Sequence, residues 1–373
     1  MTARPDEQIP APAEHAGEMS GESPGGGPRQ RQPGPARRLA RPAAGLAAVV
    51  VFQVLFASVF LGVLHHPALH HAPVAVVGTS PLADVVSRHG GGAIRLVPEP
   101  TAPAARAAIR SGQAYAAILA GRHGESLVIE TAASPGTAAA LTKGFTTAAA
   151  AMKIPLQVRD LAPLPASDPT GVSAFYLIVA WVLGGYVGAT VLAVALGGVR
   201  SPSLRHAAVR LALLAGYAAV SGLAGALLFG PAIGVAPGYS AALAAVGMLV
   251  LFAAATATAG LQAALGMSGT LLAIIAMVVF GTPTAGQSIA TALLASPWNV
   301  IGQGLPPGAG LAAARSVIYL NGENLAGPLT VLATYAAAGT LLMLAAAAWW
   351  PRHRAAPAAQ GQPAQQDLSQ LTA

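Results

Sequence analysis

Four histidines lie close together in the sequence and could bind a transition metal. They belong to the segment HHPALHH and are His65, His66, His70 and His71. Neutral imidazoles are good ligands for zinc or nickel, and they titrate near a pH of about 6.5. However, Pro67 interrupts the helical spacing that would align the rings, and no carboxylate lies nearby in the sequence. We therefore expect a polar linker rather than a metal centre, and we predict no bound cofactor.

Arg315 is the only charged residue between Arg210 and Glu323, in the segment GLAAARSVIYLNGEN. If this segment enters the outer leaflet of a membrane, the guanidinium needs a partner such as Glu323 or a lipid phosphate. Snorkelling of the side chain to the surface is the ordinary alternative. Together with Pro306 and Tyr319, Arg315 and Glu323 are our candidates for a gate or a lipid contact.

Catalytic motifs are largely missing from the chain. It has no cysteine, no GxxxxGK[ST] loop for phosphates and no HExxH metal site. Residues 211–314 contain no Asp, Glu, Lys, Arg or His, which argues against a proton relay there. The acids between residues 65 and 170 are scattered, with no close pair near a histidine: Asp84, Glu99, Glu125, Glu130, Asp160 and Asp168. We therefore predict that the protein is not an enzyme.

The composition indicates an integral membrane protein. Of the 373 residues, 54% are hydrophobic and 9% are charged, whereas soluble domains carry about a quarter charged residues. Residues 1–41 are predicted to be a disordered cytoplasmic tail. Residues 42–64 carry no charge and can cross about 30 Å of hydrocarbon, which predicts a first transmembrane helix; a cleaved signal peptide is the alternative. The net charge of +7 is spread over the tail and loops, so it indicates membrane topology rather than nucleic-acid binding.

Residues 65–170 are predicted to form a small α/β domain outside the cytoplasm. Apolar runs of strand length alternate there with helical patterns. The segments are 74–78, 81–90, 93–100, 102–113, 115–120, 126–134, 136–153 and 156–165. The sequence does not determine the order of the strands.

Residues 171–350 are predicted to form a five-helix membrane domain. The apolar stretches are 171–199, about 211–229, about 239–258, a shorter run that ends near Phe280, and 329–350. Basic residues flank these stretches so that the positive-inside rule leaves both termini, including the tail 351–373, in the cytoplasm. We therefore expect a mainly α, polytopic protein with six transmembrane helices and the α/β domain inserted between helices 1 and 2.

Residues 283–326 do not fit a simple transmembrane span. The segment is mildly apolar and is broken by Pro283, Pro297, Pro306 and Pro307. Irregular backbone at membrane depth is tolerated only inside protein or beside water. We expect short extracytoplasmic helices that re-enter or lie on the outer leaflet, with one or two further spans as the alternative.

Small residues in the segment WVLGGYVG indicate close helix packing. Gly184, Gly185 and Gly188 form a GxxxG pattern, which lets two helices approach closely, either within one chain or in a dimer. The aromatic residues nearby are typical of helix ends at a membrane interface, and a path for a lipid-like substrate is the alternative interpretation. These are Tyr176, Trp181 and Tyr186.

Several local patterns, taken in order, resemble the YhgE/Pip-like branch of the ABC-2 type membrane transporter family. They are GQAYAAILA (112–120), SPGTAAALTKGFTTAA (134–149), DLAPLPASDPTG (160–171), FGTPTAGQ (280–287) and LPPGAGLAAARSVIYLNG (305–322). The layout of one helix, an extracytoplasmic insert and five further helices is also similar. The resemblance covers about residues 43–350.

The resemblance implies one half of an export-type permease in a bacterial cell membrane. Its homodimer would be driven by a separate ATPase, and two short extracytoplasmic helices would lie between spans five and six. Members of this branch are also linked to phage reception and to secretion machinery. No clear coupling helix for an ATPase is visible unless the basic segment 200–210 serves.

Two hypotheses follow from the sequence. In the first, the protein is a permease that exports a hydrophobic or amphiphilic substrate. In the second, it is a non-transporting scaffold or receptor whose extracytoplasmic domain binds an envelope or secretion partner.

Overall fold

The computed structural model describes residues 50–62, 69–122, 124–235, 238–287 and 289–354. The predicted N-terminal tail lies outside these ranges, as does nearly all of the predicted C-terminal tail. The described part of the predicted first span is a helix, Val50–Gly62.

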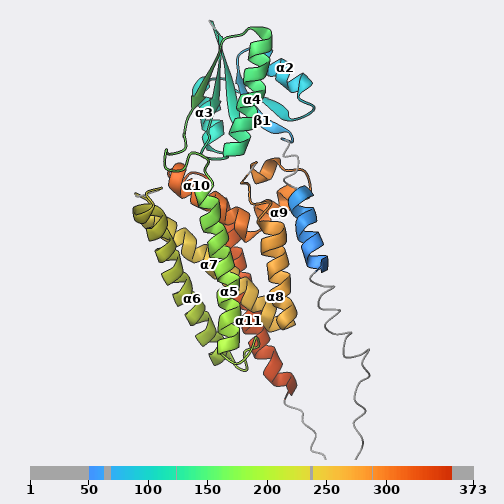
Figure 1. The fold of residues 1–373 in the computed structure, drawn as a ribbon, viewed down its shortest axis with the longest axis vertical. Helices are drawn as coiled ribbons and strands as arrows, with labels where there is room; N and C mark the ends of the chain where they lie inside the picture. The colour runs from blue at the N-terminus through green and yellow to red at the C-terminus, as the bar shows by residue number, and fades with distance from the viewer. Residues whose placement is uncertain (1–49, 63–68, 123, 236–237, 288, 355–373) are drawn as a thin grey trace, which may run out of the picture. The chain divides into compact units, whose positions relative to one another are not determined.

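The α/β domain contains a five-stranded sheet with the order β2-β1-β3-β4-β5 (Figure 1). Strands β3 and β4 pair antiparallel through a tight hairpin, and all other neighbours are parallel. The strands are β1 (Ala72–Val77), β2 (Ile94–Pro98), β3 (Ala116–Gly121), β4 (Gly124–Ile129) and β5 (Leu156–Asp160). The predicted small α/β domain is therefore present, and the structure adds the strand order.

Three helices cover the two faces of this sheet. They are α2 (Pro81–His89), α3 (Ala102–Arg110) and α4 (Pro135–Met152). The hydroxyls of Ser80 and Thr101 accept hydrogen bonds from backbone N–H groups in the first turns of α2 and α3, which fixes where these helices begin. Leu82 of α2 and Phe145 of α4 belong to the core on one face, whereas Ile109 of α3 belongs to the core on the other.

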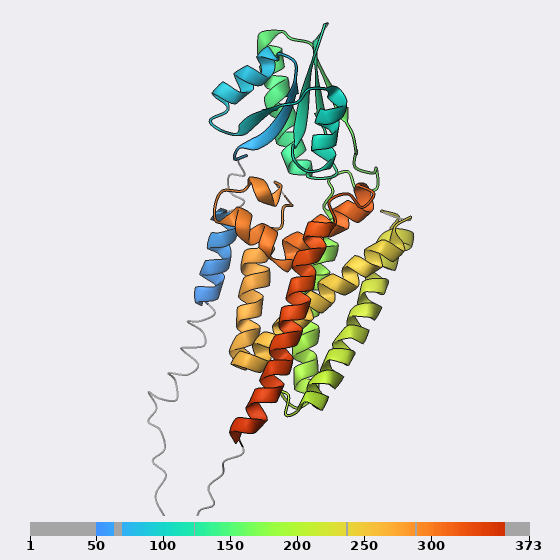
Figure 2. The ribbon, with the colours of Figure 1, turned by 180° about the vertical axis from the view of Figure 1, so that it is seen from behind.

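Four helices in the described residues are long and apolar enough to cross a membrane. They are α5 (Ser173–Ala195), α6 (Leu204–Leu227, continued by a π-helical turn to Ala232), α7 (Ser240–Leu265) and α11 (Ala326–Arg354, apolar up to Trp349). In α7, 61% of the most apolar stretch is buried, against 22 to 33% in the other three. Helix α7 is therefore the central helix, and α5, α6 and α11 pack around it (Figure 2).

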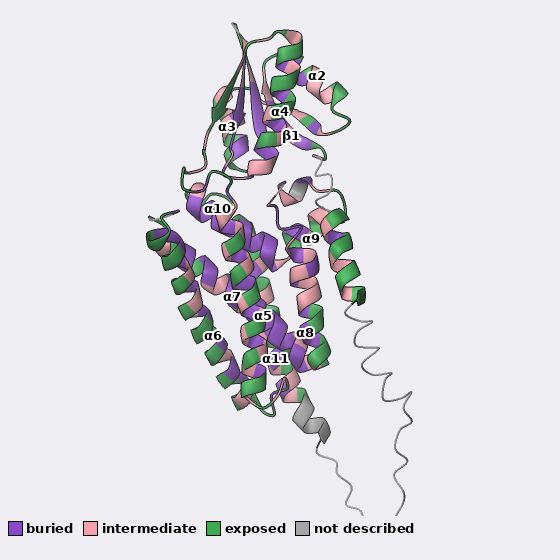
Figure 3. Ribbon diagram, viewed as in Figure 1, coloured by how far each residue is buried: buried purple, intermediate pink, exposed green. Residues whose placement is uncertain are grey.

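Large apolar side chains cover the outward faces of these helices. Val191 and Val194 on α5, Val220 on α6 and Leu341 on α11 are all exposed. Figure 3 shows exposed residues along the outside of α5 and α6, and buried residues concentrated along α7 and α10. An apolar outer surface on helices of this length is what a lipid environment favours.

The predicted fifth span differs from the structure in its boundaries. Helix α7 does not end near residue 258 but continues to Leu265, and Gly266 then adopts a φ of 71°, which only glycine accepts easily. The next apolar helix, α8 (Met267–Ile274) continued by a π-helical segment to Gly281, is too short to be counted as a span. The described residues thus contain four candidate spans, and the predicted first and fifth spans correspond to shorter apolar helices.

The segment 283–326 contains three short helices. They are a 3-10 turn (Thr291–Leu293), α9 (Trp298–Gly304) and α10 (Pro306–Tyr319). Short helices are thus present in this segment, and their position in or on the outer leaflet stays a prediction. Pro306 and Pro307 stand at the start of α10, where a missing backbone N–H costs nothing. Nearly all of α10 is buried, and it contacts α5, α7 and α11. This short helix is therefore enclosed by protein.

Residues within and beside these short helices also dock against the α/β domain. Ile289 and Leu293 belong to the same apolar core as the sheet and α4. The N–H of Ala290 donates to Thr137 Oγ1 at 3.0 Å, and Asn324 Nδ2 donates to the carbonyl of Arg110 at 2.6 Å. We call this contact region the junction.

Candidate ligand cavity at the junction

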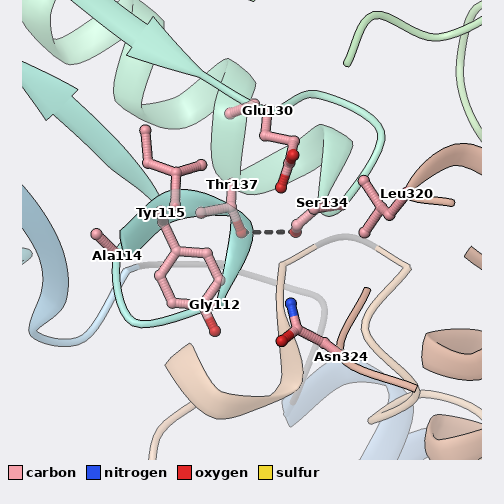
Figure 4. Close-up of a pocket in the computed structure, with 11 residues that line it drawn as sticks. Gly112, Ala114, Tyr115, Glu130, Ser134, Thr137, Leu320 and Asn324 are labelled. Carbon is pink, nitrogen blue, oxygen red and sulfur yellow. Dashed lines mark hydrogen bonds between the residues drawn. The ribbon is translucent and has the colours of Figure 1, made fainter. Parts of the chain in front are cut away.

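Two adjoining pockets open at the junction, and together we call them the junction cavity. The larger has a volume of about 210 Å³ and the smaller of about 50 Å³. Tyr115, Leu320 and Asn324 line both pockets, so the two pockets adjoin each other. Figure 4 shows the smaller pocket, with Glu130, Ser134 and Thr137 from the α/β domain and Asn324 from the loop after α10.

The domain side of the cavity lies where β3 begins and β4 ends. Because these strands are antiparallel, Tyr115, just before β3, and Glu130, just after β4, are brought to the same edge of the sheet. The Tyr115 N–H donates to the carbonyl of Pro73, which fixes this turn against β1. Ser134 and Thr137 share a hydrogen bond of 2.8 Å at the start of α4.

Arg315 lies on the bundle side of the larger pocket. Its side chain is only 5% exposed. Nη1 donates to the carbonyl of Gly286 at 2.9 Å, and Nη2 donates to Gln287 Oε1 at 3.2 Å, whereas the buried Nε has no partner. A guanidinium has five N–H donors. Arg315 is therefore a buried cation whose hydrogen-bond partners are neutral and whose donors are only partly used.

Arg315 interacts electrostatically with Tyr319 and with the carboxylate of Asp168. The Asp168 carboxylate is almost fully buried, and its Oδ2 accepts hydrogen bonds from Tyr319 Oη at 3.0 Å and from the N–H of Ser173 at 3.3 Å. No hydrogen bond joins Asp168 to Arg315. The carboxylate thus offsets the charge of Arg315 at a distance while it caps the start of α5.

Two carboxylates influence each other across the junction. Burial, and after it the negative charge of Glu323, raises the pKa of Glu130 to about 7, although Arg110 acts in the opposite direction. Burial also raises the pKa of the Tyr115 phenol. At neutral pH the lining of the cavity therefore holds a cation and an acid that is partly protonated.

The structure places the four predicted gate or lipid-contact residues in different surroundings. Arg315 and Glu323 line the same pocket, but they do not form the predicted pair: Glu323 is exposed, and its backbone carbonyl accepts a hydrogen bond from Ser316. Tyr319 binds Asp168. Pro306 is buried at the start of α10 and is not among the residues that line the cavity.

The predicted packing glycines all lie in contacts within the chain. A Cβ at Gly185 would come within 2.6 Å of Ala254 on α7, and one at Gly188 within 2.7 Å of the Tyr217 ring on α6. Gly184 faces Tyr217 and Leu251. These three residues therefore serve the packing of α5 against α6 and α7.

The histidine cluster is only partly described. His65 and His66 lie outside the described residues, and His70 and His71 are exposed. In the part of the chain that the structure describes, no three His, Asp or Glu side chains are grouped so that they could hold a metal ion. The sequence also matches GxSxG once, at residues 21–25, and these too lie outside the described ranges.

Arg210 is the functional candidate that the sequence analysis missed. It is predicted as part of a basic loop, yet it lies within α6 and is almost completely buried. It donates to the carbonyls of Val199 and Ala189 and, at 2.6 Å, to Gln262 Oε1. Gln262 Nε2 in turn donates to Thr190 and Thr270. The signal in the sequence was Gln262, a single amide in an otherwise apolar helix.

This cluster links four helices through polar side chains inside the bundle. Each of α5, α6, α7 and α8 contributes one of its members. A polar network of this kind stabilises one arrangement of the helices because breaking it leaves buried groups unpaired.

Comparison of the chain with protein-family models, with curated proteins and with solved structures finds no match.

Proposed function

We propose that the protein is a membrane permease subunit of the ABC-2-like type. It exports a hydrophobic or amphiphilic substrate, works as a homodimer and takes its energy from a separate ATP-binding subunit. It has no catalytic site of its own and does not bind nucleic acid. In this arrangement both termini are cytoplasmic, the α/β domain lies outside, and the α8 region serves as the fifth span.

The observation that supports this proposal best is the placement of α9 and α10. After the 3-10 turn, two short α-helices stand between the apolar helix Met267–Gly281 and α11, in the order that the resemblance implies. Helix α10 is buried against α5, α7 and α11, and it carries Arg315 into the wall of the junction cavity. A permease needs polar surface inside protein at such a position, because an amphiphile must leave the lipid through it.

One observation favours the alternative, a scaffold or receptor. The described connection between α5 and α6, residues 196–203, contains no helix, and α7 and α8 are separated by Gly266 alone. Arg205 and His206 lie at the start of α6 rather than in a free loop, and Arg210 is buried. These connections offer an ATPase no helix to engage, whereas a scaffold needs none.

Purification of the full chain from its own membranes distinguishes the two functions. The protein carries a C-terminal tag, is solubilised in mild detergent, and is measured by native mass spectrometry. A permease predicts a dimer with a stoichiometric ATP-binding chain. Recovery without any ATP-binding chain, and with an envelope protein attached, contradicts the permease and supports the scaffold.

A further inference from the structure

The junction cavity has the features of a site for a small charged ligand. A buried guanidinium is costly unless opposite charge or hydrogen bonds compensate it. The two hydrogen bonds of Arg315 go to neutral oxygens, and its Nε has no partner. Asp168 attracts the guanidinium electrostatically but forms no hydrogen bond with it. The charge on this wall is therefore incompletely neutralised by the protein.

The cavity beside Arg315 is large enough to hold a small anion. Its volume of about 210 Å³ is below the roughly 300 to 1,000 Å³ of pockets that enclose drug-sized ligands. It therefore suits a molecule of headgroup size. The hydroxyl of Thr291 is also in its lining and can serve as a neutral donor, whereas Ser316 and Asn324, which line it too, already donate to the carbonyls of Glu323 and Arg110.

The junction cavity also carries two acidic side chains. Glu323 lines the larger pocket, Glu130 lines the smaller, and the two carboxylates interact unfavourably. An ammonium group placed between them would relieve this repulsion. The lining of the cavity thus carries both signs of charge, which matches a ligand that carries both an anion and an amine.

We propose that the junction cavity binds a phosphate monoester or diester that also carries an amine, with the phosphate on Arg315 and the amine towards Glu323 and Glu130. Phosphoethanolamine, either free or as a lipid headgroup, has this chemistry. Arginine pairs with phosphate through two parallel N–H donors, which Arg315 can supply if Gln287 moves aside. The site does not depend on whether the protein transports anything.

The test uses the full chain in detergent and phosphoethanolamine as the probe, with binding followed by calorimetry. We expect saturable binding that is tighter than that of inorganic phosphate. Arg315→Gln should weaken it by about tenfold or more, because a charge-assisted hydrogen bond is lost, and Arg315→Lys should retain part of it. Arg88→Gln, at an exposed arginine of α2, is the matched control and should bind as the wild type does.

A second variant keeps the charge and fills the space. Ala312 lines the larger pocket with an exposed side chain, so Ala312→Leu should weaken binding while Arg315 and its hydrogen bonds stay intact. This variant decides the outcome if Arg315→Gln fails to fold.

The source of the ligand is tested by native mass spectrometry of the same proteins from nanodiscs that contain phosphatidylethanolamine. Retention of this lipid by the wild type, and its loss from Arg315→Gln or Ala312→Leu, identifies a lipid headgroup. Binding of the free probe alone identifies a soluble ligand. Equal binding by the wild type and by both variants overturns the proposal, as does folded wild-type protein that binds neither probe nor lipid.

Discussion

The phenol of Tyr319 donates a hydrogen bond of 3.0 Å to the carboxylate of Asp168, 151 residues earlier in the chain. Tyr319 is the last residue of α10, and Asp168 lies just before α5. The same carboxylate oxygen accepts the N–H of Ser173, the first residue of α5. One buried acid therefore joins the end of the short-helix segment to the start of a candidate membrane span, at the point where the chain leaves the α/β domain.

Removing the Tyr319 hydroxyl should lower the stability of the folded protein. Tyr319→Phe keeps the ring but leaves the buried Asp168 carboxylate without one of its two donors, which costs about 1.5 to 3 kcal/mol for a hydrogen bond to a charged group. We expect a lower thermal unfolding midpoint, measured by intrinsic fluorescence in detergent. Tyr176→Phe, at a tyrosine that is 66% exposed, is the control and should leave the midpoint unchanged. Equal midpoints for the two variants would mean that the Asp168 contact contributes nothing.

Helix α11 packs against α7 through a close approach at Gly339. A Cβ at this position would come within 2.3 to 2.5 Å of the backbone of Thr256 and Ala257, and Gly260 faces the Gly339 carbonyl in the same way. Gly339→Ala should therefore force the helices apart and lower the yield of folded protein and its thermal midpoint, by about 1 to 3 kcal/mol for an overpacked core.

Gly216 of α6 supplies the matched control for Gly339. A Cβ there meets nothing within 4 Å, so Gly216→Ala should be neutral or should stabilise the helix by up to about 1 kcal/mol. Both variants are compared in one thermal denaturation series. The packing account of Gly339 is wrong if the two substitutions shift the midpoint in the same direction and by the same amount.

The local elements of the fold could be read from the sequence, because their signals are local. The predicted segments 81–90 and 102–113 begin where α2 and α3 begin, directly after the caps Ser80 and Thr101. The strand order could not be predicted, since β1 lies between β2 and β3 only through pairings that are distant in sequence. The extent of α7 was missed because Gly260 is a turn signal in sequence, yet here it marks contact with α11.

The candidate site could be predicted only in part. Arg315 stood out as a lone charge in an apolar segment, and the structure places it on a cavity wall. Its predicted partner, Glu323, instead interacts with Glu130, which is almost 200 positions away in sequence and gives no local signal. The sequence places Arg210 in a loop because a charged side chain near the end of a helix is usually exposed to water. Its burial depends on Gln262 and on carbonyls of two other segments, which no local pattern reveals.

The Arg210 network should be essential for the stability of the bundle. Gln262→Leu removes the acceptor at 2.6 Å from Arg210 and the donor to Thr190 and Thr270. Arg210 Nη2 keeps the Ala189 carbonyl and Thr190 keeps the Tyr186 carbonyl, but the network loses three hydrogen bonds, at about 0.5 to 3 kcal/mol each. We expect a markedly lower thermal midpoint and faster proteolysis in detergent.

Two further variants test the cause of this effect. Gln303→Leu makes the same change at an exposed position and should have little effect. Gln262→Glu keeps an acceptor for Arg210 and adds a counter-charge, so its midpoint should lie above that of Gln262→Leu. If all three variants have the same thermal midpoint as the wild type, the network does not contribute to the stability of the bundle.

Glu130 should make stability depend on pH in a defined direction. Its ordinary pKa of 4.5 is raised to about 7 in the folded protein, first by burial and then by the charge of Glu323. Between these values the folded state holds a proton that the unfolded state has lost, so stability falls as the pH rises from 4.5 to about 7 and changes no further above it. Glu130→Gln removes this dependence because the amide does not ionise.

We expect the thermal midpoint of the wild type to fall relative to that of Glu130→Gln across this window, in a series of buffers from about pH 4 to about pH 8. Glu99→Gln, at a glutamate outside the junction cavity, is the control and should follow the wild type. A difference between wild type and Glu130→Gln that stays constant over the series would show that Glu130 ionises as readily in the folded protein as in the unfolded chain. A difference that grows in favour of the wild type as the pH rises would show that folding favours the ionised form, and either result contradicts the prediction.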